Sequence, residues 1–329
     1  MSRPRSAYVI LCLVAAGCSE TANRAIDSAL LADSLGSGSR LASREGFIAV
    51  PGGRVWYRVA GSRDATPLLL LHGGPGVPSN YLNPLLALAD ERPVVIYDQL
   101  GTGKSDQPTD TTLWRTERFV RELQTVRDSL GLVEVHLYGH SWGTMLAAEY
   151  LATNPTGVKS VIFASPALSA ARWTADAESL IRLLPDSVQR AIAAGERRRN
   201  YDSPAYKRAV DAYYQRFLSV KPQGIDAESS ATRIATSIYL QMWGPTEFKS
   251  TGSLRTYDAT PRLPAISIPA LFTAGEFDEA TPATTRYYAS LVPGAEFALI
   301  PGAAHMTTND NPEETIRILR EWLRKVDAR

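Results

Sequence analysis

The stretch that decides the fold is VEVHLYGHSWGTMLAA, residues 133–148. The apolar run 133–138 precedes the pentapeptide Gly139-His140-Ser141-Trp142-Gly143, and helix-forming residues follow it. A strand, a tight turn and a helix in this order form the setting in which a G-x-S-x-G motif exposes a serine hydroxyl at the start of a helix. The glycines are needed because side chains at their positions would clash in so tight a turn. We therefore predict a nucleophilic serine at position 141.

Further short apolar runs lie on both sides of this motif. They cover residues 46–50, 55–60, 67–72, 93–98, 158–164, 269–274 and 297–300. Runs that are apolar on both faces are typical of a parallel sheet covered by helices on each side. The first two flank Pro51-Gly52-Gly53, which predicts a hairpin, and helical spacing over 119–130 and 315–326 predicts helices. The expected fold class is α/β, with a mostly parallel central sheet and helices on both of its faces.

The alternation of strands and helices stops between residues 166 and 263. Helix start signals at Pro185-Asp186 and Ser203-Pro204 replace it. We expect an inserted helical cap at 166–263, flanked by the two parts of the α/β core at 45–165 and 264–329. Such a cap would lie over the carboxyl ends of the strands, where open α/β sheets bind ligands.

A serine hydroxyl needs a base before it can act as a nucleophile. Of the four histidines, His72 lies at a predicted strand end, His136 lies within a predicted strand, and His140 directly precedes the serine, so its side chain is expected to point away from the serine hydroxyl. His305 remains, in a loop that follows the last predicted strand. We therefore predict that His305 is the base.

The base needs an acid that fixes its tautomer and stabilises its charged form. Asp278 follows the predicted strand 269–274 directly and is our candidate, with Glu276 and Asp310 as alternatives. The resulting chain order of Ser141, Asp278 and His305 is that of the α/β-hydrolases.

The third predicted strand ends in His72-Gly73-Gly74-Pro75-Gly76. A glycine-rich loop at this place lets backbone N–H groups approach a reacting carbonyl, and we expect the N–H groups of Gly74 and Trp142 to form an oxyanion hole. A phosphate-binding loop is the alternative, but the Lys-Ser/Thr pair that should follow its glycines is missing here.

Taken together, these segments resemble the proline iminopeptidases, serine aminopeptidases of the α/β-hydrolase fold that remove an N-terminal residue. The resemblance runs from about residue 45 to the end and is carried by residues 72–76, 98–105, 139–143 and 275–282, and by His305. The sequence is most similar to the tricorn-interacting-factor type, because it has MWGPTEF at 242–248 and the pair Asp278-Glu279. In that type, two glutamates at these places bind the substrate ammonium group.

The resemblance implies this amine-binding role for Glu247 and Glu279. It also implies release of an N-terminal proline or small apolar residue from short peptides or amino-acid amides through an acyl-enzyme. Gly73 and Trp243 are expected to contact the substrate. The aromatic residues expected around its side chain are Trp142, Tyr239, Trp243 and Phe248.

Composition limits the alternatives to this function. The 329 residues carry 35 basic and 34 acidic side chains, a net charge of +1, so there is no basic excess for nucleic-acid binding. Two cysteines and four histidines do not indicate a zinc module, and the mechanism implies no metal, organic cofactor or obligate protein partner. An esterase, lactonase or amino-acid amidase on the same scaffold stays open, because fold and triad do not separate these activities. A surface binding protein without catalysis is disfavoured by the intact set of candidate catalytic residues.

The first residues are typical of an export signal. The basic stretch Ser2-Arg3-Pro4-Arg5 precedes an apolar run at 7–16, which is shorter than the ~20 residues of a spanning helix. Ala15-Ala16-Gly17-Cys18 resembles the lipobox of bacterial lipoproteins, which implies a signal peptide at 1–17 and a lipid on Cys18. The segment 18–44 is rich in small and polar residues and is expected to be a flexible tether. By this resemblance, Ser19 favours the outer membrane, facing the periplasm, if the host is Gram-negative.

Overall fold

The computed structural model describes residues 43–61 and 64–329. The expected signal peptide, Cys18 and most of the expected tether lie outside the described residues. The core begins two residues before the expected boundary at 45, because the first strand starts at Ser43. Among residues 43–61 and 64–329, no helix has the length and apolar character needed to cross a membrane.

Eight strands form one sheet in the order β1-β2-β4-β3-β5-β6-β7-β8. The strands are β1 (Ser43–Val50), β2 (Gly53–Ala60), β3 (Leu68–Leu71), β4 (Val94–Tyr97), β5 (Val135–His140), β6 (Val158–Ala164), β7 (Ala270–Gly275) and β8 (Glu296–Ile300). The pairs β1–β2 and β2–β4 are antiparallel, and every other neighbouring pair is parallel. The predicted fold class and the N-terminal hairpin are thereby confirmed.

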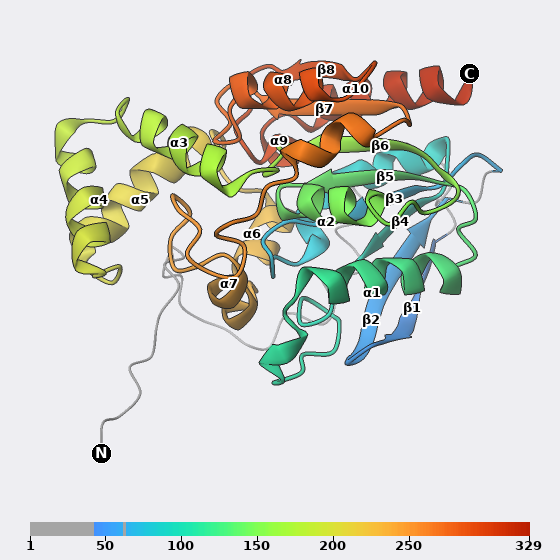
Figure 1. The fold of residues 1–329 in the computed structure, drawn as a ribbon, viewed down its shortest axis with the longest axis horizontal. Coiled ribbons are helices and arrows are strands. Elements are labelled where there is room, and N and C mark those ends of the chain that lie inside the picture. Colours follow the sequence, from blue (N-terminus) through green and yellow to red (C-terminus); the bar gives the residue numbers. More distant parts are fainter. Residues whose placement is uncertain (1–42, 62–63) are drawn as a thin grey trace.

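Helices cover both faces of the sheet (Figure 1). Outside the cap they are η1 (Ser79–Asp90), η2 (Thr111–Leu113), α1 (Thr116–Ser129), α2 (Trp142–Leu151), α8 (Pro282–Leu291), α9 (Thr307–Asp310) and α10 (Pro312–Asp327). Leu69 and Leu71 of β3 belong to the same core cluster as apolar side chains of α1, α2 and α8. Leu68 and Leu70 belong to a second cluster with side chains of η1 and α10. Successive strand residues point to opposite faces, so each apolar strand serves two cores.

The segment 166–263 is helical and projects from one side of the sheet (Figure 1). It contains α3 (Ala170–Ile181), α4 (Asp186–Arg198), α5 (Pro204–Phe217), α6 (Ile225–Ala231) and α7 (Thr236–Met242), and η3 (Thr260–Ala265) begins at its end. Two of these helices begin where the sequence predicted. Pro185 is the N-cap of α4, and the Ser203 hydroxyl caps α5 by accepting a hydrogen bond from the Tyr206 N–H.

The cap is bonded to the loops that follow the last two strands. The carbonyl of Phe217, the last residue of α5, accepts hydrogen bonds from the N–H groups of Glu279 (3.2 Å) and His305 (3.1 Å). The carbonyl of the next residue, Leu218, accepts one from the Met306 N–H (2.8 Å). The cap therefore lies at the carboxyl ends of β7 and β8.

Candidate active site

Ser141 lies in a sharp turn between β5 and α2, with φ 54° and ψ −120°. This left-handed conformation is uncommon for a residue with a side chain and costs free energy of order 1–3 kcal/mol. Both motif glycines are sterically required. A Cβ atom on Gly139 would lie 2.4 Å from the Gly143 carbonyl oxygen, and one on Gly143 would lie 2.1 Å from the Leu71 carbonyl oxygen. The turn therefore fixes the serine backbone in the conformation expected of a nucleophile.

His305 and Asp278 are joined by a hydrogen bond of 2.8 Å between Nδ1 and Oδ1. Both side chains are buried. The second carboxylate oxygen of Asp278 accepts hydrogen bonds from the Ser165 hydroxyl (2.6 Å) and the Gly275 N–H (3.2 Å). An imidazole that donates from Nδ1 to a carboxylate leaves Nε2 free to accept a proton. Ser141 and His305 line one cavity of about 760 Å³.

The alternative acids have other partners. Glu276 accepts a hydrogen bond from the Gly302 N–H at the surface (2.9 Å). Asp310 is fully buried and holds the cap segment that follows α5, because its carboxylate accepts hydrogen bonds from the Ser219 hydroxyl and the Val220 N–H. Asp278 is therefore the carboxylate that is paired with His305.

The glycine-rich loop after β3 lies against the serine. A Cβ atom on Gly73 would be 3.0 Å from the Cβ atom of Ser141. The N–H group of Gly73 donates to the Tyr81 hydroxyl (2.7 Å). Gly74 and Trp142 line a small pocket together with Ser141. Trp142 is the first residue of α2, where backbone N–H groups have no carbonyl one turn earlier to bond.

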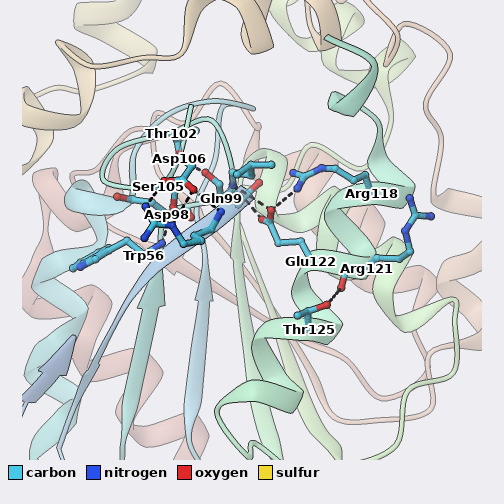
Figure 2. A network of polar contacts seen from close by, with 12 residues as sticks. Trp56, Asp98, Gln99, Thr102, Ser105, Asp106, Arg118, Arg121, Glu122 and Thr125 are labelled. Carbon is cyan, nitrogen blue, oxygen red and sulfur yellow. Dashed lines mark hydrogen bonds and ion pairs between the residues drawn. The ribbon is translucent and has the colours of Figure 1, made fainter. Parts of the chain in front are cut away.

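The loop after β4 holds the two sides of this pocket together. The side chain of Gln99 donates to the His72 carbonyl (3.0 Å) and accepts from the Trp142 indole N–H (2.9 Å). Its backbone N–H donates to the ring of His72 (2.9 Å), so this histidine binds the loop that carries Gln99. Figure 2 shows Gln99 beside the buried pair Arg118–Glu122. Glu122 accepts a hydrogen bond from the N–H of the residue after Gln99 and so fixes the loop from its other side.

His140 connects the glycine-rich loop to His305 through a chain of hydrogen bonds. The Nε2 atom of His140 lies 3.0 Å from the His305 carbonyl oxygen, and its Nδ1 atom lies 3.0 Å from the Tyr81 hydroxyl. A carbonyl can only accept, so Nε2 carries the proton and Nδ1 accepts from Tyr81, which in turn accepts from Gly73. Burial, with a contribution from His305, lowers the pKa of His140 to about 3, so this ring is neutral at neutral pH.

The remaining histidine lies away from the cavity. The ring of His136 is bonded to the Ser160 hydroxyl (2.7 Å) and to the Asp327 carboxylate (2.9 Å). Within residues 43–61 and 64–329, no group of three or more histidine, cysteine or acidic side chains is arranged to hold a metal ion.

Glu247 and Glu279 line the same cavity as Ser141 and His305. Glu279 is only 2% exposed, and neither of its carboxylate oxygens has a hydrogen-bond partner of ordinary geometry among the described residues. Burial and the nearby carboxylates of Glu247 and Asp278 raise the pKa of Glu279 well above its usual range, and the Tyr213 hydroxyl opposes this only in part. A buried carboxylate is costly unless a positive charge compensates it, so this position suits the cationic group of a ligand.

Glu247 is partly buried and accepts a hydrogen bond from the Tyr239 hydroxyl. Burial raises the pKa of Glu247, although Tyr239 and the charge of His305 act in the opposite direction. Two acidic groups with raised pKa values therefore share one wall of the cavity, and both favour a positively charged guest.

The small pocket beside Ser141 is walled by apolar side chains, among them Trp142, Trp173 and Trp243. Trp173 was not singled out from the sequence. Its indole N–H donates to the Glu247 carbonyl (2.8 Å), and its ring lies edge-on to that of His305 with 5.7 Å between the ring centroids. The expectation for Phe248 was wrong, because its ring packs inside the cap against the ring of Tyr213 (4.8 Å between centroids).

Comparison with known proteins agrees with this geometry. Residues 66–312 match the family described as the alpha/beta hydrolase fold. The proline iminopeptidase of Heyndrickxia coagulans is 46% identical over 286 residues, covering 86% of this chain and 99% of that protein. The proline iminopeptidase of Levilactobacillus brevis is 39% identical, with 82% and 93% covered. The crystal structure of the proline iminopeptidase of Mycobacterium smegmatis superposes with a TM-score of 0.82 at 32% identity, covering 87% of this chain and 99% of that one. The chain therefore belongs to the proline iminopeptidase family, within the α/β-hydrolase fold.

Proposed function

We propose that this protein is a serine aminopeptidase that releases an N-terminal proline, or another small apolar residue, from short peptides or amino-acid amides. The observation that carries the proposal is the buried carboxylate of Glu279 in the cavity that Ser141 and His305 line, which has no hydrogen bond of ordinary geometry among the described residues. The family relationship supports the same activity, since the relatives reported above are proline iminopeptidases.

In the proposed reaction, Nε2 of His305 takes the proton of the Ser141 hydroxyl, and Asp278 stabilises the imidazolium. The serine oxygen attacks the first carbonyl carbon of the substrate. The N–H groups of Gly74 and Trp142 bind the oxyanion, and losing one such donor typically costs ~2.7–4 kcal/mol of transition-state stabilisation. His305 then protonates the leaving nitrogen as the C–N bond breaks, and water hydrolyses the acyl-enzyme.

The two glutamates explain why such an enzyme would act only at a free N-terminus. An ammonium group forms charge-assisted hydrogen bonds with Glu247 and Glu279 and supplies the missing cation. An internal peptide offers a neutral amide at this place and leaves the carboxylates uncompensated. In this scheme the pyrrolidine ring lies beside Ser141 and contacts the wall that carries Trp243 and the loop that carries Gly73.

A comparison of matched substrates tests the proposal. We expect hydrolysis of the arylamides of proline, alanine and leucine, and at least ~100-fold lower kcat/KM for the N-acetylated analogues. The Glu247→Gln variant should raise KM for the free-amine substrates and leave the hydrolysis of simple esters unchanged. Equal turnover of free and blocked substrates would refute amine recognition.

An esterase, lactonase or amino-acid amidase on this scaffold is the second candidate. Simple esters and lactones carry no ammonium group, so these substrates would give the buried Glu279 no partner. An amino-acid amidase would use the same two glutamates, and the relative kcat/KM for prolinamide and for Pro-containing dipeptides separates it from a peptidase.

We also propose that the chain is exported and anchored to the bacterial cell envelope by a lipid on Cys18, so that a lipid bilayer is its second partner. The support is the sequence of residues 1–18 alone. Buried acyl methylenes contribute ~0.8 kcal/mol each, so several chains would hold the protein firmly. The Cys18→Ala variant should move the protein into the soluble fraction, and unchanged membrane fractionation would refute this anchor.

A further inference from the structure

The proposed function leaves one part of the cavity without an occupant. The side chain of the released residue lies beside Ser141 against the tryptophans, and the two glutamates bind its amine. The cavity continues from His305 to α6, and its volume of about 760 Å³ is in the range that holds an entire drug-sized ligand. This remaining part, between His305 and α6, is called the leaving-group region below.

Much of the wall of the leaving-group region is apolar. Its lining includes Val77, Leu218, Ala227, Ala231, Ile234 and Met306. All but Ala227 are partly exposed, and Val77 and Met306 also pack against the core cluster of η1 and α10. Of the polar side chains that line the same cavity near α6, Lys221, Gln223, Glu228 and Thr232 are exposed to solvent. The Ser219 hydroxyl donates to Asp310, and the buried Ser230 hydroxyl accepts a hydrogen bond from the Tyr81 N–H. A guest in this region therefore meets apolar side chains and hydroxyl groups that already have partners, whereas the charged groups lie at the exposed edge.

The chemistry places the leaving group on this side of Ser141. The leaving nitrogen receives its proton from His305, so the chain that follows it must start beside His305. Met306 is the next residue, and its N–H donates to the Leu218 carbonyl (2.8 Å). Met306 directly follows the base, and Leu218 directly follows Phe217, whose carbonyl accepts the backbone N–H of the base. Both Met306 and Leu218 have apolar side chains.

The wall near His305 is also fixed in position. Asp310, which is fully buried, accepts hydrogen bonds from the Val220 N–H (3.0 Å) on the cap segment and from the Ala304 N–H (2.9 Å), directly before His305. One carboxylate therefore ties the cap side of the region to the loop that carries the base. A subsite with rigid walls can select between leaving groups, because less ordering is needed on binding.

We propose that the leaving-group region is a specificity subsite that selects an apolar residue directly after the released one. This inference rests on the proposed aminopeptidase function. The favoured substrates are peptides of the class Pro-Leu and Pro-Phe, and polar residues of similar size at the second position are disfavoured because they lose hydration against apolar walls.

Dipeptide amides test the subsite in the wild-type enzyme. Leucine and asparagine have similar shapes, so Pro-Leu-amide and Pro-Asn-amide differ mainly in polarity, and prolinamide has no second residue. A single methylene in an apolar pocket changes kcat/KM by ~10–200-fold, so we expect Pro-Leu-amide to exceed Pro-Asn-amide by at least about tenfold. Values within twofold of each other, with prolinamide still cleaved, would overturn the subsite and leave the proposed function intact. Failure to cleave any of the three would overturn the proposed function itself.

A variant pair locates the effect. Ala231→Asp places a charge in the leaving-group region, whereas Ser237→Asp places the same charge on the exposed surface of α7. The readout is the ratio of kcat/KM for Pro-Leu-amide to that for prolinamide, in which any loss of folded enzyme cancels. We expect the ratio to fall at least about tenfold in Ala231→Asp and to stay at the wild-type value in Ser237→Asp. An unchanged ratio in Ala231→Asp would contradict the assigned location.

Discussion

Replacing Glu279 by glutamine should make the protein more stable and less active. Its carboxylate is buried and lacks a hydrogen-bond partner of ordinary geometry among the described residues. An unsatisfied buried polar group costs about 1–3 kcal/mol, and more when it is charged. The amide of Glu279→Gln has a similar shape and cannot ionise, so the folded variant has neither a buried charge nor the cost of keeping an acid protonated above its ordinary pKa. We therefore expect the free energy of unfolding of the substrate-free enzyme to rise by about 1–3 kcal/mol at pH 8, well above the ordinary pKa of a glutamate side chain.

The size of this stabilisation should depend on pH. The pKa of Glu279 is raised in the folded protein, so near neutral pH the folded state binds more protons than the unfolded state. Stability then falls as the pH rises from the unfolded value towards the raised folded value. The Glu279→Gln variant lacks this loss, so its advantage over the wild type should be larger at pH 8 than at pH 5. Thermal unfolding at both pH values measures it.

The same variant should lose affinity for free amines. A hydrogen bond to a charged group contributes about 1.5–3 kcal/mol, which corresponds to a ~10–150-fold lower kcat/KM for proline arylamide. Hydrolysis of a simple ester, which makes no such contact, is the internal control. A variant that is less stable than the wild type, or that cleaves proline arylamide normally, would refute the assignment of Glu279 as an amine-binding group.

Three further substitutions test the supports of the site. Tyr81→Phe breaks the hydrogen-bond chain between the glycine-rich loop and the loop of the base, and we expect it to lower kcat about tenfold in a steady-state assay. Tyr97→Phe is the control, because the Tyr97 hydroxyl has no partner among the described residues, and its kcat should stay within twofold of the wild-type value. Ser165→Ala removes the 2.6 Å hydrogen bond to the Asp278 carboxylate, and we expect kcat to fall about tenfold with little change in KM. An unchanged kcat would show that Ser165 does not position Asp278. Gly143→Ala brings a Cβ atom to 2.1 Å from a backbone carbonyl oxygen and should prevent folding. In Gly131→Ala the added Cβ atom has no neighbouring atom within 4 Å, so thermal unfolding should show a loss of stability of only ~1–2 kcal/mol.

Much of the candidate site could be predicted from the sequence, because backbone geometry fixes the positions of its main residues. Ser141, Asp278 and His305 each follow the end of a strand in a parallel sheet, and such ends meet at one edge. The need for Gly139 and Gly143 could also be predicted, because added side chains would collide with backbone atoms that every member of the fold has. The helix starts at Pro185 and Ser203 were predictable from capping chemistry alone.

The supporting side chains could not be predicted in the same way. Trp173 and Tyr81 act through contacts with segments that are distant in sequence, so no local pattern indicates them. Ser165 could have been found from the sequence, because it directly follows a predicted strand. It stands at the end of β6 as Ser141 stands at the end of β5, and it also has a positive φ, of 47°. Phe248 was assigned to the substrate pocket from its position in a motif, but the cap has a core of its own that buries it.

The most direct test is the reactivity of Ser141 towards a fluorophosphonate probe, measured by intact-protein mass and peptide mapping. We expect one adduct on the wild-type protein, located on Ser141, none on Ser141→Ala, and much slower labelling of His305→Gln. Prolinamide should slow the labelling of the wild type, whereas N-acetyl-prolinamide should not. A wild-type protein that stays unlabelled, or a Ser141→Ala variant that is labelled equally well, would contradict the role of Ser141 as the nucleophile.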